Sequence, residues 1–245
     1  MKSQTKLVLT TLYSKANPKN VAGMARYGIS SKNKVLGISM PFLQSLKKNI
    51  GKDHELALDL WQTKVYEARL LAAFLADPNL LSKSVMNTWV HDFDNWAICD
   101  GVCMHCFRNT PNAHELIAKW IRQKSEFVRR SGFTMIATLS VADKKSDDAV
   151  FLKYLPLIKK YSTDERNYVK KAVNWALRQI GKRNLKLNNA AIKTAKEIQK
   201  LDSSSAKWIA VDALREFKST AVQKRLKRNI HAYIKKPKRK ITSRF

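Results

Sequence analysis

The chain has 245 residues, of which 47 are Lys or Arg and 19 are Asp or Glu, so its formal net charge is +28. Its 44% apolar content is enough to bury a sizeable core, which argues against a disordered protein, and no apolar run approaches the roughly 20 residues of a membrane span. So strong a basic character is typical of a protein that binds a polyanion, and nucleic acid is the expected partner.

The first fifty residues are predicted to form helices. An apolar-periodic stretch covers residues 7–13, a second segment covers 21–27 before the breaker Gly28, and a helix follows between Pro41 and Gly51. Only seven Gly and six Pro occur in the chain, and alternating β-branched runs are few. We therefore predict an all-α protein.

A short pattern, in which a cation adjoins small residues on a helix, recurs along the chain. The later copies are about 40 residues apart, a period typical of HEAT-type helix pairs, and the segment around Trp96 takes the place of a missing copy. We predict one HEAT-like helical-repeat solenoid over residues 1–230, followed by a basic, disordered tail over 231–245. The copies begin at Tyr66, Glu126, Asn167 and Ser205.

A solenoid lines its concave face with one helix of each pair, so the recurring cations are expected to form a column. Such a column would follow a phosphate backbone and release its counterions. The alternative is that these cations are ordinary residues of the repeat on solvated helix faces. The cations of the pattern are Arg69, Arg129, Arg130, Lys170, Lys171 and Lys207.

Trp96 and Asp100 are four residues apart, which places an indole and a carboxylate on one face of a helix. Trp175 lies among polar neighbours at a comparable place in a later repeat. A carboxylate there can stabilise positive charge on a sugar as a glycosidic bond breaks, or position the attacking water. The alternatives are indoles buried in the core and an Asp100 that only pairs with a cation; Asp92 and Asp94 are competing acids.

Cys99, Cys103 and Cys106 would lie at i, i+4 and i+7 on a helix, which predicts a single buried stripe of structural cysteines. An odd number of cysteines and no secretory signal favour a reducing cytoplasm. The alternatives are a metal ion held with His105 or His91, and an iron–sulfur cluster. The enzymes that use this spacing for a cluster are β/α barrels, which a helical chain does not form.

The C-terminal region carries much of the charge: about ten Lys and Arg, and no acid, lie between Lys224 and Phe245. Without it the body would still carry roughly +18. The run over residues 235–240 is expected either to bind anions without sequence preference or to act as a solubilising tail. The chain contains no Walker loop, dinucleotide fingerprint, H-E-x-x-H or G-x-S-x-G motif, which excludes several common enzyme classes.

Several short sequence segments, taken together in their order, resemble the AlkD-like DNA alkylation repair family over roughly residues 5 to 230. The resemblance implies a HEAT-like solenoid and a DNA glycosylase that excises cationic N3- and N7-alkylpurines without flipping the lesion into a deep pocket. These segments, in order, are Leu36-Gly37-Ile38 with Pro41, Glu67-Ala68-Arg69, Trp96 with Asp100, Phe127-Val128-Arg129-Arg130, and residues 167–178.

Carried over to this sequence, the resemblance implies that Trp96, Asp100 and Trp175 flank the deoxyribose of the damaged nucleotide. It implies that Arg130, or else Arg129, grips the phosphate backbone. An aromatic residue near the N-terminus that helps to hold DNA is matched by either Tyr13 or Tyr27. Further DNA contacts are expected from Lys170, Lys171, Arg178 and Lys207.

A cationic alkylpurine is already a good leaving group, so an acid that stabilises the cationic sugar is sufficient for its excision. We predict a monomeric glycosylase of the cytoplasm and nucleoid that acts on double-stranded DNA with alkylated purines, without a metal, another cofactor or a membrane. The alternatives are a non-catalytic solenoid that binds damaged or branched DNA by shape and charge, and an adaptor for a protein partner.

Overall fold

The computed structural model describes residues 2–234, and for residues 229–234 it describes the backbone alone. The basic run over 235–240, for which the sequence predicts disorder, therefore lies outside the described residues. None of the described helices is both long and apolar enough to cross a membrane. The described part of the chain contains no strand, and its regular structure is helical throughout.

The helices follow one another along the described chain, and the connections are short apart from the loop over residues 27–39 between α2 and α3. They are α1 (Ser3–Ser14), α2 (Pro18–Arg26), α3 (Met40–Ile50), α4 (His54–Gln62), α5 (Tyr66–Leu75), α6 (Lys83–His91), α7 (Trp96–His105), the 3₁₀ turn η1 (Phe107–Asn109), α8 (Ile117–Arg122), α9 (Glu126–Ala142), α10 (Asp148–Leu152), α11 (Leu155–Tyr161), α12 (Asn167–Gly181), α13 (Leu185–Gln199), α14 (Ser204–Lys218) and α15 (Thr220–Ile234). The last helix continues past residue 230, the boundary predicted for the domain.

Local side-chain chemistry sets several helix boundaries. The side chain of Asn95 accepts hydrogen bonds from the N–H groups of Ala97 and Ile98, so α7 begins at Trp96. Gly51 ends α3 in the left-handed conformation with φ of 79°, which confirms the helix predicted between Pro41 and this glycine.

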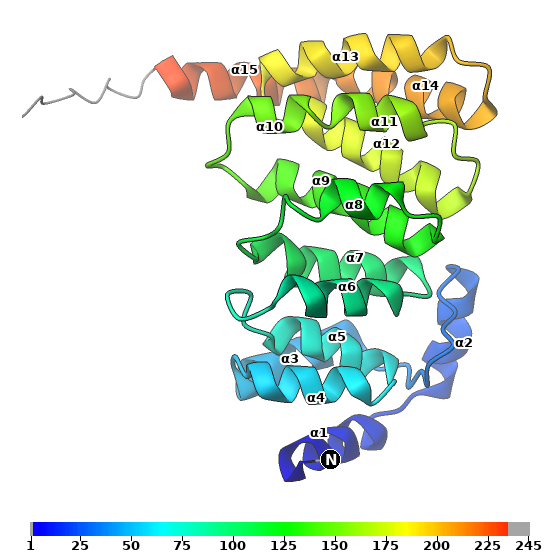
Figure 1. Ribbon diagram of the computed structural model, residues 1–245, viewed down its shortest axis with the longest axis vertical. Coiled ribbons are helices and arrows are strands. Elements are labelled where there is room, and N and C mark those ends of the chain that lie inside the picture. The colour runs from blue at the N-terminus through cyan, green and yellow to red at the C-terminus, as the bar shows by residue number, and fades with distance from the viewer. Residues whose placement is uncertain (1, 235–245) are drawn as a thin grey trace, which may run out of the picture.

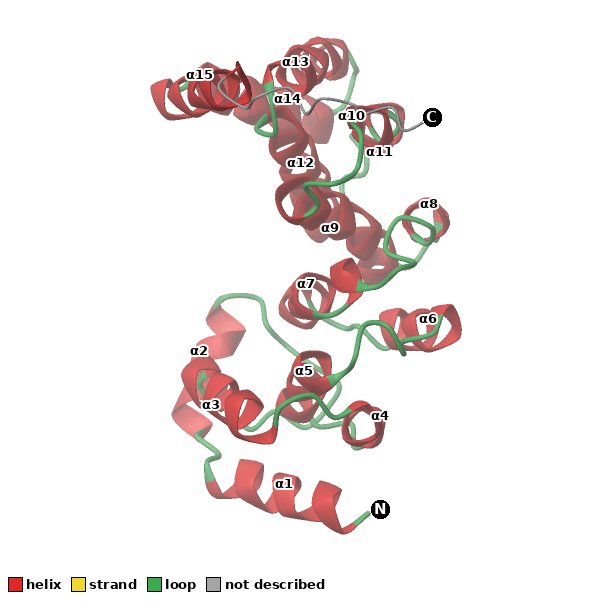
Figure 2. Ribbon diagram, turned by 90° about the vertical axis from the view of Figure 1, so that its left-hand side faces the viewer, coloured by secondary structure: helices red, strands yellow, loops and turns green. Residues whose placement is uncertain are grey.

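The helices pack in two layers that form a curved array (Figure 1). The inner layer consists of α5, α7, α9, α12 and α14, each packed against the next. Figure 2 shows α4, α6, α8 and α11 on one side of this layer, while α2, α3 and α15 project on the other, concave side. The all-α HEAT-like solenoid predicted from the sequence is confirmed.

The recurring sequence pattern marks the start of the inner helices. Its copies coincide with the first turns of α5, α9, α12 and α14, and α7 with Trp96 stands in the inner layer between α5 and α9. The outer segment before α12 consists of two short helices, α10 and α11. Leu155 and Pro156 begin the second of them.

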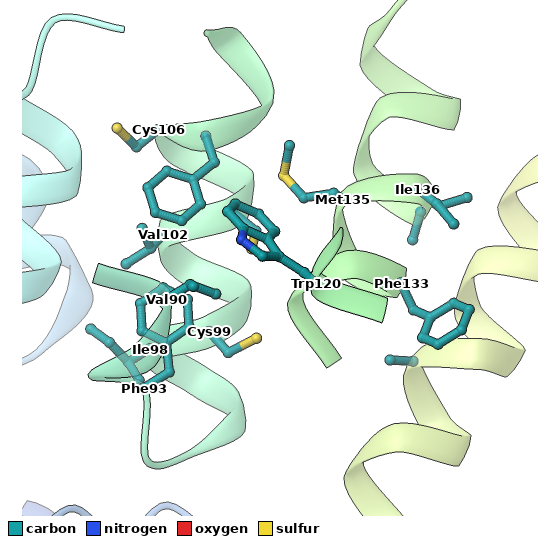
Figure 3. Packing of buried hydrophobic residues seen from close by; sticks show 14 of the residues in the cluster. Val90, Phe93, Ile98, Cys99, Val102, Cys106, Trp120, Phe133, Met135 and Ile136 are labelled. Carbon is teal, nitrogen blue, oxygen red and sulfur yellow. The ribbon is translucent and has the colours of Figure 1, made fainter. Parts of the chain in front are cut away.

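The core lies between the layers and is rich in large aromatic side chains. Trp61 and Trp89 stack with ring centroids 4.0 Å apart, and Trp120 is also fully buried. Figure 3 shows Trp120 between the labelled side chains of α7 and Met135 of α9. Close packing of rings on successive repeats ties each repeat to its neighbour.

The three cysteines are completely buried and have free thiols, which confirms the predicted stripe. Burial raises the pKa of Cys106 to about 12 and that of Cys103 well above its usual value, so both thiols stay protonated. The Sγ atom of Cys99 lies 3.1 Å from the hydroxyl oxygen of Ser131 on α9. Among the described residues, no three His, Cys, Asp or Glu side chains are grouped so as to hold a metal ion.

Two acids fix the loop between α2 and α3 against the solenoid. The buried carboxylate of Glu67 accepts hydrogen bonds from the backbone N–H groups of Leu36 (2.9 Å), Gly37 (2.7 Å) and Ile38 (3.3 Å). Asp94, ahead of α7, accepts others from the same loop, including the backbone N–H of residue 32 at 2.6 Å. These contacts hold α2 on the concave side.

Candidate functional site

A polar cavity of about 490 Å³ opens where α2 meets the first turns of α7 and α12. Three cations and one carboxylate are among the residues that line it, so its charge is net positive and suits a polyanion. The lining residues are Arg26, Tyr27, Gly28, Trp96, Asp100, Arg130, Asn167, Tyr168 and Lys171.

Asp100 is held rigidly at the wall of this cavity. The Nε and Nη2 atoms of Arg130 donate to its two carboxylate oxygens at 2.9 and 2.7 Å, and the Thr134 hydroxyl donates to one of them at 3.0 Å. The side chains of Arg130 and Asp100 are 7% and 17% exposed. This bidentate pair fixes the orientation of the carboxylate, which still borders the cavity.

Arg130 is engaged in hydrogen bonds within the protein. Its Nη1 atom donates to the carbonyl oxygen of Tyr168 at 2.6 Å, so all three of its nitrogen atoms donate within the protein. Burial lowers the pKa of this guanidinium, but the Asp100 carboxylate outweighs that effect and raises it. Arg130 thus joins α7, α9 and α12 and orients Asp100, and its side chain is only 7% exposed at the cavity wall.

The wall formed by α2 is attached by two hydrogen bonds from distant helices. The indole N–H of Trp96 donates to the carbonyl oxygen of Tyr27 at 3.0 Å, and the Tyr168 hydroxyl donates to that of Gly28 at 3.1 Å. Gly28 has φ of +68°, and a Cβ atom there would lie 2.5 Å from the Tyr168 hydroxyl oxygen. Only glycine fits this close approach.

The sequence offers two N-terminal aromatics, Tyr27 and Tyr13, as the residue that helps to hold DNA. The structure places them differently. Tyr27 lines the cavity and is 75% exposed, whereas Tyr13 lies on α1 and does not line it. Sequence reasoning missed Arg26, Gly28 and Tyr168 as parts of the site. Gly28 was visible as a helix breaker, but nothing in the sequence connects it to a residue 140 positions later.

Trp175 lies outside the cavity that contains Trp96 and Asp100. It is half-buried on α12, one turn after Lys171, and packs against the core. The structure therefore brings Trp96 and Asp100 together at one cavity. The sequence predicts Trp175 on the opposite wall, but that wall is formed by Tyr168 and Lys171 in the first turns of α12. The indole shares a helix face with Tyr168 and Lys171, so it continues the same surface along α12.

Arg69 and Arg129 hold their own repeats together and do not belong to an exposed column. The Nε atom of each donates to a carbonyl oxygen eight residues earlier, at 3.1 and 2.9 Å. Arg69 also pairs with Asp92 (3.0 Å), and Arg129 pairs with Asp164 (2.6 Å). The alternative of solvated helix faces does not describe these two residues either, since their side chains are only 7% and 15% exposed. Asp92 is used in this packing and does not line the cavity.

The other predicted DNA contacts lie on α12 and α14 in different environments. Lys171 is exposed and lines the cavity, whereas Lys170 lies 5.8 Å from the centre of the Trp208 ring. Arg178 is paired with two carboxylates of α14, at 3.3 and 3.0 Å. Lys207 is exposed and lies 3.3 Å from Asp202, which is more exposed still. Lys171 is thus the predicted contact that the fold places at the cavity.

Comparison with known proteins gives one family and one fold. The model of a family described as DNA alkylation repair enzyme matches residues 8–230. A solved structure is described as belonging to a new family of proteins related to the HEAT-like repeat DNA glycosylases with affinity for branched DNA structures. It superposes with a TM-score of 0.70 at 20% identity, covering 86% of this chain and 94% of its own. No curated protein matches the sequence.

Proposed function

This chain belongs to the DNA alkylation repair enzyme family, and on that premise we propose that it is an alkylpurine DNA glycosylase. It hydrolyses the N-glycosidic bond of cationic N3- or N7-alkylpurines in double-stranded DNA, as a monomer and without a cofactor. The observation that carries the proposal is the carboxylate of Asp100, oriented by Arg130 beside the Trp96 indole in an open cavity with cationic walls.

The proposed reaction uses the charge that the lesion already carries. As the bond between C1′ and N9 of the alkylpurine breaks, the electron pair stays with the base, where it neutralises the charge of the alkylated ring, and positive charge passes to the deoxyribose. The Asp100 carboxylate stabilises that charge, and water adds its hydroxyl to C1′ while its proton is released. The products are a neutral alkylpurine and an abasic site, so a strong general acid is unnecessary.

The surrounding residues have supporting roles in this proposal. Arg130 and Thr134 keep the carboxylate in one orientation, so little reorganisation is needed during the reaction. Trp96 offers an indole to the sugar, and Lys171 is available to a neighbouring phosphate. We propose that Trp175 contacts the strand farther along α12. An open cavity of this kind suits a nucleotide that is not flipped deeply out of the duplex.

The test is release of 7-methylguanine and 3-methyladenine from methylated duplex DNA, measured by chromatography with enzyme in excess. Wild-type protein should release both bases, and Asp100→Asn should be slower by about 10²–10³-fold, the usual loss for one electrostatic catalytic group. Trp175→Ala tests the proposed contact outside the cavity and should weaken DNA binding. Unchanged excision by folded Asp100→Asn would remove Asp100 from the chemistry.

A second candidate function is non-catalytic binding of branched DNA. Two observations favour it: the similar solved structure is described as having affinity for branched DNA structures, and the Asp100 carboxylate is already occupied by an ion pair. In that case a four-way junction should be bound more tightly than linear duplex, and no base should be released at any enzyme excess. The Asp100→Asn variant, where folded, should then bind as tightly as wild type.

A further inference from the structure

A second cationic cavity, which we call the edge cavity, lies beside the first one at the rim of the solenoid. Its volume is about 460 Å³. The loops that precede α9 and α12 border it, and Figure 1 shows both loops on the same edge of the array as α2. The described residues that line it are Lys124, Arg129, Lys160, Tyr161, Thr163, Asp164 and Arg166.

The charge of the edge cavity is poorly compensated. Asp164 is the one acid in its described lining, and it already accepts hydrogen bonds from Arg129 (2.6 Å) and Arg166 (2.6 and 2.8 Å). Lys124 and Lys160 are exposed and have no carboxylate partner among the described residues. Like charges gathered around a hollow repel one another, and an anion that enters it relieves that repulsion.

Arg166 differs from Arg130 in its exposure: its side chain is 34% exposed, against 7% for Arg130, and each of its Nη atoms carries a second N–H beyond the one already used. Arg166 donates from Nη1 to the carbonyl oxygen of Lys124 at 2.7 Å, while Asp164 holds its Nε and Nη2 atoms. These contacts fix the planar guanidinium between the two loops, where it lines the edge cavity. A fixed guanidinium flanked by two lysines is a combination that binds phosphate groups.

The two cavities lie on either side of the start of α12. Asn167 and Tyr168 line the first cavity, and Arg166, the preceding residue, lines the edge cavity. Lys160 and Tyr161 belong to α11, which Figure 2 shows on the outer side of the inner layer, so the outer layer supplies part of the wall of the edge cavity. A duplex that follows the concave face passes the first cavity, and only DNA that turns around the rim reaches the second.

We propose that the edge cavity binds a backbone phosphate of a second DNA arm, one that leaves the concave face at a branch point. This inference rests on the proposed binding of DNA at the first cavity. It adds a separate contact, made through Lys124, Lys160 and Arg166, that linear DNA does not use.

The experiment compares Lys124→Glu/Lys160→Glu with Lys186→Glu/Lys196→Glu, a control that changes the charge equally at exposed positions of α13. Binding of a four-way junction and of a linear duplex of equal arm length is measured between about 50 and 200 mM salt. The edge variant should bind the junction roughly tenfold more weakly, with a salt slope smaller by about 1, since one lost phosphate contact removes about 0.9. The edge variant should bind linear duplex as tightly as the control variant does.

Three results would overturn the inference: undiminished junction binding by the edge variant, an equal loss on linear duplex, or an equal loss in the control. Excision from linear methylated duplex should be unchanged in the edge variant, and a parallel loss of excision would also count against a separate site. A wild-type protein that binds neither DNA would refute the proposed function together with the inference. Loss of the junction preference alone leaves the proposed function standing.

Discussion

Replacement of Asp100 by Asn removes more than a candidate catalytic group, because the carboxylate is also the counterion of a buried guanidinium. Two charge-assisted hydrogen bonds, of 2.9 and 2.7 Å, join it to Arg130, whose side chain is only 7% exposed. Removing one partner of a buried pair usually costs 3–5 kcal/mol. Since Asp100 is 17% exposed and Asn can still accept one bond, we expect a loss of about 3 kcal/mol.

A double-mutant cycle separates this structural loss from a chemical one. Arg130→Gln leaves the carboxylate with the Thr134 hydroxyl as its partner and should also lose about 3 kcal/mol. The double variant Asp100→Asn/Arg130→Gln contains no unpaired charge. It should therefore be no less stable than either single variant, far from the additive loss that independent sites would give.

Urea unfolding measures the stabilities of the wild type, the two single variants and the double variant. Single-turnover release of 7-methylguanine measures the chemistry, at a temperature at which all four proteins are folded. Both variants that lack the carboxylate should remain at least about 10²-fold slow, including the stable double variant. Arg130→Gln retains the carboxylate and should be affected less. If the double variant excises at the wild-type rate, the role of Asp100 is structural and the proposed chemistry is refuted.

Three further outcomes are expected. Gly28→Ala should lower stability by about 1–3 kcal/mol and weaken DNA binding, because its Cβ would meet the Tyr168 hydroxyl at positive φ; thermal unfolding and a binding assay measure both. Lys171→Ala should bind duplex roughly tenfold more weakly, with stability unchanged within about 0.5 kcal/mol. Burial opposes ionisation of Asp143, but hydrogen bonds from Ser146 and His114 prevail and hold its pKa well below the usual range. Its stabilisation should be complete above about pH 4 and be lost as the pH falls, so urea midpoints should drop more steeply in acid for wild type than for Asp143→Asn.

The repeat architecture could be predicted because short local sequence patterns determine it. Each inner helix begins with its own copy of the pattern, and the spacing of the copies is the spacing of the helix pairs. Trp96 could be placed for the same reason, since it stands where a copy is missing. Periodicity reports which residues share a helix face, and that information was sufficient for the fold class, for the buried cysteines and for the pairing of Trp96 with Asp100.

The positions of the cations could not be predicted from periodicity. Arg129 and Arg130 are neighbours in sequence, yet one packs against an outer helix and the other faces Asp100 on α7. A rotation of about 100° between adjacent helical residues separates those environments. The acid that pairs with each arginine lies 30 or more residues away in the sequence. Tyr27 likewise reaches the cavity through a contact with the distant Trp96.

The hydrogen bond from Tyr168 to Gly28 joins residues 140 positions apart and has a consequence for the order in which the molecule assembles. In repeat proteins each unit interacts chiefly with its neighbours, so structure can spread along the chain from any starting point and the ends fray first. Here α2 is fastened to α12, which opposes fraying of the first unit. During synthesis the α2 segment emerges early but gains this partner only after residue 168 has left the ribosome. The cavity between α2, α7 and α12 is therefore completed late, after the segments that form the central repeats have emerged.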